Sequence, residues 1–503
     1  MALTLLLPST ENKTSLAELD NDTKNNSDLL IIPQCNVSSE EEKLPVRETW
    51  PTKCDYLVTT LGGLIGLGSI WRFPYLAFQN GGATFVIPYV IISLLCGIPL
   101  LMMETALGQF SSEGPVGCWN FAPAMKGIGI ASVLISFSGA LYYVMIMVWG
   151  GIYLVHSFAT IGKQLPWSDN AIENLAGINS TLQFSNQSVI TSVEKFWNDS
   201  ILNKSHDLSG LSTFHWPNVV GLFVMWCIIY FCLWKGIKLT SRVAVFTAFF
   251  PYIPMIALFI RGITLEGSWY GLQYYLIPDV KQLLSSKAWT QAAGHVLWAY
   301  GIGWGIIPAL SSYNRPDYNF FNDILITGTT SILTNIFSGF VVFPVTCESV
   351  LTGAFDKISG LRKKKKKLRE IIVAIYVLIS FLCGLPMCTK AGFYIFNLFD
   401  SYICGTLPLL IICIIELFTV LFCYRTTLSS WFEKRKPNAW PGKLFIRHIS
   451  EVLKRNLTFI WICWLFIIPI WLFGMLSIAE AFEPPHQQPL LAITKCHVLK
   501  LFI

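Results

Sequence analysis

The chain has 503 residues, of which 53% are hydrophobic and only 13% charged. A soluble domain carries about 25% charged residues, so charge this sparse cannot cover a water-exposed surface of this size. The formal net charge of +6 is modest for this length and gives no reason to expect nucleic acid as a partner. The composition therefore indicates an integral membrane protein, with the lipid bilayer as its main surroundings.

The termini and cysteines add little chemistry. Residues 1–46 are polar and acidic and predict a disordered cytoplasmic N-terminus. Most of the 14 cysteines lie inside apolar segments, as Cys232 and Cys413 do, and there they are expected to act as small hydrophobes. The sequence lacks a CxxC motif or a Cys/His cluster that would indicate a metal site.

Ten segments are apolar and long enough to be membrane-spanning helices. A bilayer core of about 30 Å requires about 20 apolar residues per helix. The segments are residues 57–78, 85–107, 128–158, 219–234, 243–263, 292–310, 324–345, 371–385, 408–424 and 459–478.

Loop charges and glycosylation sequons predict the orientation. Basic residues after the fourth and ninth spans, and a basic loop at 357–369, indicate cytoplasmic loops. The loop at 162–217 is predicted to be a large glycosylated extracellular loop because it holds four sequons. These lie at Asn179, Asn186, Asn198 and Asn203.

The two signals conflict at the seventh span. With a cytoplasmic N-terminus, that span should end outside the cell, yet the basic run at 362–369 requires it to end inside. Either one crossing is missing before this run, or residues 324–345 enter the membrane and return without crossing.

Glycine clusters mark the first and sixth spans. Two such clusters, five spans apart, indicate interrupted helices at matching places in two repeats, the usual sign of a transporter binding site. Interrupted backbone frees carbonyl groups for cations and amide groups for a carboxylate. Close helix packing through small residues is the alternative reading. The clusters are Gly62, Gly63, Gly66 and Gly68, and Gly301, Gly303 and Gly305.

The stretch GGLIGLGSIWRFPYLAFQNGGATFVIPY at 62–89 resembles the first-helix signature of the neurotransmitter:sodium symporter family. Further matches are RETW at 47–50, ALYY at 140–143, YYLIPD at 274–279 and FNLFDSY at 396–402. The resemblance covers residues 47 to 478. It implies an all-α polytopic membrane protein at the plasma membrane, with an inverted-repeat sodium symporter fold and broken first and sixth helices.

The resemblance also implies a substrate pocket and two gates. Tyr143 would donate its hydroxyl to a substrate carboxylate, and Trp298 would be an aromatic lid. Gly66 replaces the Asp of monoamine carriers, which favours an amino-acid-like substrate with its own carboxylate. The pocket would comprise Gly63, Gly66, Gly68, Gly139, Tyr143, Trp298, Gly301 and Trp304. The outer gate would be Arg72 and Asp400, and the inner gate Arg47 and Asp356 with Trp50 and Tyr313 beside them.

The ion sites depart from the family pattern. The first sodium site would use Leu64, Ser69, Ala299 and Ser331, but Ala supplies no side-chain oxygen and Ser reaches less far than Asn. Of the second sodium site, only backbone ligands at Gly62 and Ile65 would remain. The chloride site would comprise Tyr89, His295, Ser331 and Asn335, with Ala299 at a Ser position. We therefore expect weak chloride dependence. His295 is either a pH-sensitive replacement or a packing residue.

The largest departure is a gap in the second half. Residue 343 continues through PVT directly into CESVLTGAFD, so the external loop and most of the eighth helix of the family are expected to be absent. This would leave 10 to 11 helices and would explain the missing crossing. The twelfth helix is also expected to be absent, because the tail at 481–503 is too short and mixed to span. The transporter domain would then comprise residues 47–480.

Two functions remain open from the sequence. The first is sodium-coupled symport of a small amino acid or amino-acid-like neurotransmitter. The second is a non-transporting relative or isoform that regulates a full-length partner, as a homo- or hetero-oligomer with related transporters. An enzyme is not expected, because the sequence contains no nucleophile elbow, P-loop or metal-ligand spacing.

Overall fold

The computed structural model describes residues 49–161, 166–167, 195–205, 211, 213–234, 244–265, 268–279, 283, 285–346, 367–424 and 443–481, apart from residues 51, 67 and 247. Within these residues the regular elements are helices, and the β pairing is a single bridge between Phe214 and Thr389. The predicted all-α class is therefore confirmed.

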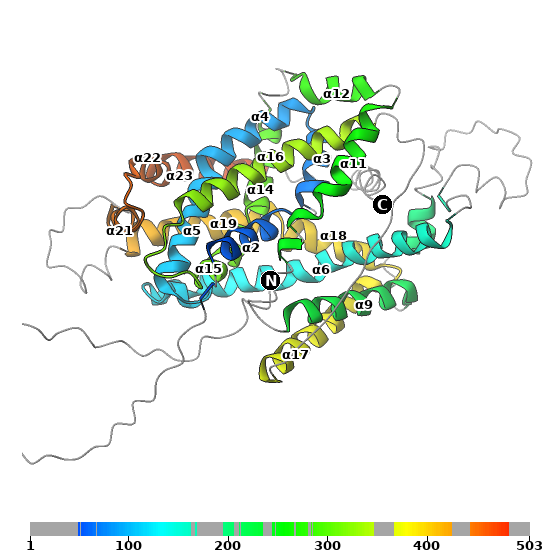
Figure 1. Ribbon diagram of the computed structural model, residues 1–503, viewed down its shortest axis with the longest axis horizontal. Helices are drawn as coiled ribbons and strands as arrows, with labels where there is room; N and C mark the ends of the chain where they lie inside the picture. Colours follow the sequence, from blue (N-terminus) through cyan, green and yellow to red (C-terminus); the bar gives the residue numbers. More distant parts are fainter. Residues whose placement is uncertain are drawn as a thin grey trace, which may run out of the picture.

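The helices lie in one bundle (Figure 1). Their first half comprises α2 (Lys53–Leu64), α3 (Phe73–Gln79), α4 (Ala83–Ile92), α5 (Ile98–Ser111), α6 (Lys126–Ala159), α9 (Trp216–Leu233), α11 (Tyr252–Ile263) and α12 (Ser268–Leu276). Their second half comprises α14 (Ser286–Ala299), α15 (Ile306–Ser311), α16 (Phe321–Thr346), α17 (Lys367–Gly384), α18 (Gly392–Leu398), α19 (Thr406–Phe418), α21 (Lys443–Leu453), α22 (Thr458–Ile462) and α23 (Ile468–Ala481).

Six helical stretches of the described residues are long and apolar enough to cross a membrane. Shorter apolar helices lie at Tyr252–Ile263 and Val373–Cys388. The six stretches are Ala83–Ser111, Pro123–Ala159, Trp216–Leu233, Phe321–Phe343, Thr406–Cys423 and Thr458–Met475.

The outer helices expose apolar side chains, as expected when lipid is the surrounding solvent. In Figure 1, α9 and α17 lie together along one edge, and both pack against α6. Large side chains on these helices and on α11 point outward, among them Phe223, Ile253 and Leu382. In contrast, twelve of the fourteen residues of α5 are buried, so α5 is a central helix of the bundle.

Two sequence predictions are revised by the helices. The seventh span is one continuous helix, α16, and a helix of this length does not turn back, so the alternative of a returning segment is wrong. The fifth predicted span at 243–263 is a named, continuous helix only over Tyr252–Ile263. Residues 347–366, where the gap in the second half was predicted, lie outside the described residues.

The described end of the long polar loop docks on the segment after α17. The backbone N–H of Ser205 donates to Lys390 O (3.0 Å), and the N–H of Lys390 donates to Thr213 O (3.1 Å). The N–H of His215 donates to Cys388 O (2.8 Å), and the Lys204 ammonium lies 5.1 Å from the ring centre of Phe393. Burial lowers the pKa of both Lys204 and His215.

Candidate functional site

The sixth predicted span is interrupted as the glycines predict. Residues 300–305 are not helical and separate α14 from α15. Gly301, Gly303 and Gly305 have φ angles of 63°, 78° and 69°, a region that side chains rarely tolerate. The freed N–H of Gly303 donates to the Glu104 carboxylate of α5 (2.7 Å). The glycines therefore allow the backbone angles of this break, and the buried Glu104 carboxylate stabilises it through a hydrogen bond.

The first predicted span is also interrupted, and the two breaks are neighbours. Helix α2 ends at Leu64, and a π-helical turn begins at Gly68 (Gly68–Arg72). A Cβ placed on Gly301 would lie 3.8 Å from Leu64 Cδ2. The prediction that both spans are broken and meet inside the bundle is confirmed.

Two tryptophans fill the space beside the breaks. The Trp298 ring covers Gly68 so closely that a Cβ there would lie 1.6 Å from the Trp298 Cζ3 atom. The Trp304 ring packs on Gly139 of α6 in the same way, at 2.2 Å. The two rings lie 6.3 Å apart and perpendicular. Only glycine at 68 and 139 leaves room for this arrangement.

Tyr143 on α6 faces the first break. Its hydroxyl lies 3.1 Å from where a Cβ on Gly66 would be, and its ring centre lies 6.3 Å from that of Trp298. A side chain at position 66 would therefore meet this hydroxyl. The structure brings together most of the predicted pocket, while Gly63 lies in the last turn of α2 and is half-buried.

An ion pair closes one side of this region. Arg72 Nη1 lies 3.3 Å from Asp400 Oδ1, and both side chains are largely buried, at 22% and 10% exposed. The Arg72 guanidinium also lies 5.2 Å from the ring centre of Trp298. The predicted outer gate pair is therefore in contact, directly above the tryptophan predicted to act as a lid.

A second contact closes the opposite side. The indole N–H of Trp50 donates to Leu310 O at the end of α15 (3.0 Å), and its backbone N–H donates to Tyr313 O (3.1 Å). The Trp50 and Tyr313 rings meet edge to face at 6.0 Å. Arg47 and Asp356, the predicted charged pair of the inner gate, lie outside the described residues.

The residues predicted for sodium supply few side-chain oxygens. The Ser69 hydroxyl donates to Leu64 O (3.5 Å), and Ala299 is buried and has no side-chain oxygen. Ser331 on α16 is fully buried. For the second predicted site, Gly62 packs against Ala244 O, and Ile65 is buried.

The residues predicted for chloride converge in a closed, buried group. The Asn335 side chain donates to the Tyr89 hydroxyl (2.5 Å), and the Ser331 hydroxyl lies beside the same phenol. The His295 ring sits between aromatic rings, 5.6 Å from that of Tyr89. The His295 ring is buried, and the Asn335 side chain lies beside it.

Sequence reasoning missed two buried acids. Glu104 on α5 and Glu416 on α19 are 1% and 3% exposed and lie beside each other. Glu104 binds the freed amide of Gly303, so it positions the break in the sixth span. A lone acid within an apolar run is a functional signal in membrane proteins, and both residues carry it.

An all-helical, multi-pass bundle in which two broken helices meet between two closed sides has the architecture of a secondary transporter. The sequence profile of the sodium:neurotransmitter symporter family matches residues 47–347 and 344–489. The chain belongs to this family. The predicted family and multi-pass plasma-membrane location are thereby confirmed.

Named relatives are transporters. The rat (Rattus norvegicus) sodium- and chloride-dependent GABA transporter 2 is 32% identical over 461 residues, covering 78% of this chain and 76% of the relative. The human (Homo sapiens) sodium- and chloride-dependent creatine transporter 1 is 32% identical over 435 residues, covering 71% and 67%. The dog (Canis lupus familiaris) sodium- and chloride-dependent taurine transporter is 31% identical over 453 residues, covering 76% and 72%.

Some predictions stay open. The family match is in two parts that meet at 344–347, where the sequence predicts that the eighth helix is missing. Of the sequons, Asn198 and Asn203 lie in the described part of the long loop, and Asn203 has a positive φ of 46°. Asn179 and Asn186 lie outside the described residues, as do most of 162–217, the N-terminus at 1–46 and nearly all of the tail at 481–503.

Proposed function

We propose that this chain is a sodium-coupled symporter of a small amino acid or amino-acid-like zwitterion that carries a carboxylate. The observation that carries the proposal is the meeting of the two broken spans between the Arg72–Asp400 pair and the Trp50 contact. Backbone groups freed at such breaks can hold a cation and an anionic substrate group at the same point. The closed contacts on both sides fit an occluded step of alternating access.

The carboxylate is inferred from Gly66 and Tyr143. Because position 66 is glycine, it has no acidic side chain that could pair with a substrate amine. The Tyr143 hydroxyl faces the space that a side chain at 66 would fill. A phenol donates well to a carboxylate. The relatives are named for GABA, creatine and taurine, and of these GABA and creatine carry a carboxylate and taurine a sulfonate. Trp298 and Trp304 leave little room, which favours a substrate of that size.

We propose that sodium drives transport and that chloride binds beside Tyr89. The relatives are named as sodium- and chloride-dependent transporters. The polar side chains of Tyr89, Ser331 and Asn335 converge in this buried place beside the His295 ring, which favours an ion there over simple packing. This revises the expectation of weak chloride dependence. Because Ala299 supplies no side-chain oxygen, sodium would depend more on backbone carbonyls such as Leu64 O.

Uptake in cells that express the full chain tests the proposal. Labelled GABA, taurine, creatine and a mixed amino acid pool are supplied with sodium, with N-methylglucamine in its place, and with gluconate in place of chloride. We expect sodium-dependent uptake of at least one substrate, strongly reduced in Tyr143→Phe at equal surface expression. Equal uptake with and without sodium, or none despite surface expression, would contradict it.

A further inference from the structure

One buried side chain of α5 organises the segment between α15 and α16, residues 312–320, which we call the inner loop. Gln109 is fully buried, and its side-chain N–H groups donate to Pro316 O (3.1 Å) and Tyr318 O (2.9 Å). Its side-chain oxygen accepts from the Asn314 side chain (3.3 Å). Gln109 therefore spends both of its donated hydrogens and its acceptor on the inner loop.

The residue before Gln109 brings α5 against α15. A Cβ on Gly108 would lie 2.3 Å from Pro308 O, so glycine is needed for this close approach. One turn earlier on α5, the Glu104 carboxylate accepts from the N–H of Gly303 at the break in the sixth span. Helix α5 therefore contacts the break, α15 and the inner loop in succession. The three helices α2, α5 and α15 lie close together in Figure 1.

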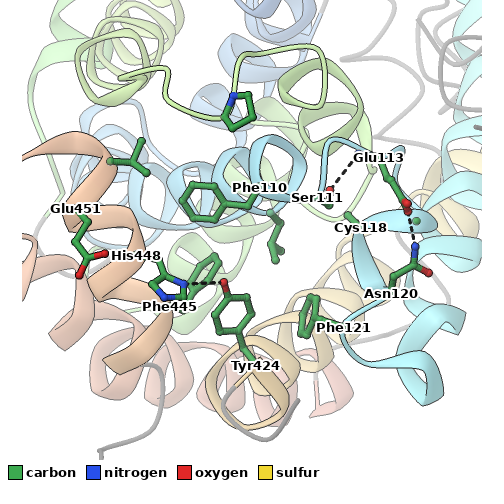
Figure 2. Close-up of a pocket in the computed structure, with 14 residues that line it drawn as sticks. Phe110, Ser111, Glu113, Cys118, Asn120, Phe121, Tyr424, Phe445, His448 and Glu451 are labelled. Atoms are coloured by element: carbon green, nitrogen blue, oxygen red, sulfur yellow. Dashed lines mark hydrogen bonds between the residues drawn. The ribbon is translucent and has the colours of Figure 1, made fainter. Parts of the chain in front are cut away.

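One side of the inner loop faces a cavity. The cavity has a volume of about 690 Å³ and lies beside Glu113, and Pro316 of the loop forms part of its wall. Figure 2 shows Phe110 and Ser111, at the end of α5, on the wall of the same cavity. Because the loop borders a cavity there and not packed side chains, its position depends on the hydrogen bonds that Gln109 makes.

The first span packs on this loop through Tyr56 of α2. Tyr56 is 2% exposed, and its ring meets that of Tyr318 edge to face at 6.0 Å. Its hydroxyl lies beside Asn314 of the inner loop and Thr105 of α5. The two loop residues that surround Tyr56, Asn314 and Tyr318, are both hydrogen-bonded to Gln109. Gln109 therefore shapes the surface on which the first span closes.

We propose that Gln109 is a positioning residue of the inner closure, and that Tyr56 is the residue of the first span that the positioned loop receives. The inference rests on the proposed function in treating this closure as a step of transport. Loss of the Gln109 hydrogen bonds loosens the inner loop, which weakens the packing of Tyr56 and, with it, the neighbouring Trp50–Tyr313 contact. The equilibrium then shifts toward the state that is open on the inner side.

Hydrogen exchange of the purified full-length protein in nanodiscs tests the proposal. The Trp50 N–H donates to Tyr313 O (3.1 Å), so this amide exchanges when the inner contact breaks. Gln109→Met keeps the length of the side chain and removes its three hydrogen bonds. We expect the Trp50 amide to exchange about ten-fold faster in this variant, the order expected when one or two buried hydrogen bonds are lost. The control Gln291→Ala removes the acceptor of the Asn80 side chain on α14 and should leave the Trp50 amide unchanged.

A double-mutant cycle separates positioning of the first span from simple stabilisation of the loop. Tyr56→Phe keeps the ring and removes the hydroxyl, so it should speed exchange of the Trp50 amide by itself. If Gln109 acts through Tyr56, the double variant should exchange more slowly than the product of the two single effects requires.

Three results would overturn the proposal. The first is that the effects of Gln109→Met and Tyr56→Phe simply multiply. The second is that Gln109→Met speeds exchange within residues 312–320 while the Trp50 amide keeps its rate. The third is an unchanged Trp50 amide in Tyr56→Phe, which decides the matter even when Gln109→Met does not fold. The measurement requires no uptake, so this proposal and sodium-coupled symport can fail separately.

Discussion

The ion pair between Arg72 and Asp400 allows a quantitative test of the outer closure. The two charges lie 3.3 Å apart, and their side chains are 22% and 10% exposed. At an effective dielectric constant of about 20, two unit charges at this distance attract by about 5 kcal/mol. Desolvation offsets much of this, so we expect a net coupling of about 2 kcal/mol, or roughly 30-fold in a rate or equilibrium constant.

A double-mutant cycle measures this coupling. Arg72→Gln, Asp400→Asn and the double variant are compared by kcat/KM of sodium-dependent uptake at equal surface expression. Each single variant should lose about 30-fold or more, because it leaves a largely buried charge unpaired. The double variant should lose little more than either single one. Arg72→Lys keeps the charge but loses the planar contact with Trp298, so a loss of only a few-fold is expected.

Two results would show that the ion pair does not contribute to closure. If the loss in the double variant equals the product of the two single losses, the residues act independently and the ion pair does not contribute to closure. A single variant with unchanged uptake would have the same meaning.

Three further changes test the interior and the docked end of the long polar loop. Gly68→Ala places a Cβ 1.6 Å from the Trp298 ring, so we expect a lower melting temperature and abolished uptake; wild-type values would contradict this packing. Glu104→Ala should lower the melting temperature by leaving the Gly303 N–H unpaired, at a cost of about 1–3 kcal/mol, while Glu104→Gln keeps an acceptor and should lower it less. Because burial lowers the pKa of His215, the undocked loop binds a proton more readily, and docking should weaken as the pH falls below about 6.5. Hydrogen exchange of loop amides at pH 7.5 and 5.5, corrected for intrinsic rates, should show this in the natural chain and not in His215→Asn.

The broken spans could be predicted because their cause is local. Glycine at 301, 303 and 305 is needed for backbone angles that other residues avoid, and that requirement is visible in the sequence. The Arg72–Asp400 contact, between residues 328 positions apart, was predicted only through the family resemblance. The charge of Arg72 predicts an acidic partner but does not identify which acidic residue it is.

Other features depend on packing that the sequence does not display. Glu104 looks like an isolated acid in an apolar run, and its role follows only from the amide it meets on another span. The cavity beside Glu113 draws its walls from segments more than 300 residues apart, so no local pattern marks it. Tight contacts such as Trp304 on Gly139 likewise require the fold, because small residues have many uses.

Equilibrium binding to the purified protein tests most directly whether the two broken spans form one site for a zwitterion and sodium. Labelled GABA, taurine and creatine are titrated with and without sodium, and sodium is titrated with and without the ligand. We expect sodium to raise the affinity for one of them about ten-fold or more, and that ligand to raise the affinity for sodium by the same factor. Saturable binding that sodium leaves unchanged, or no saturable binding of any of the three, would contradict the account.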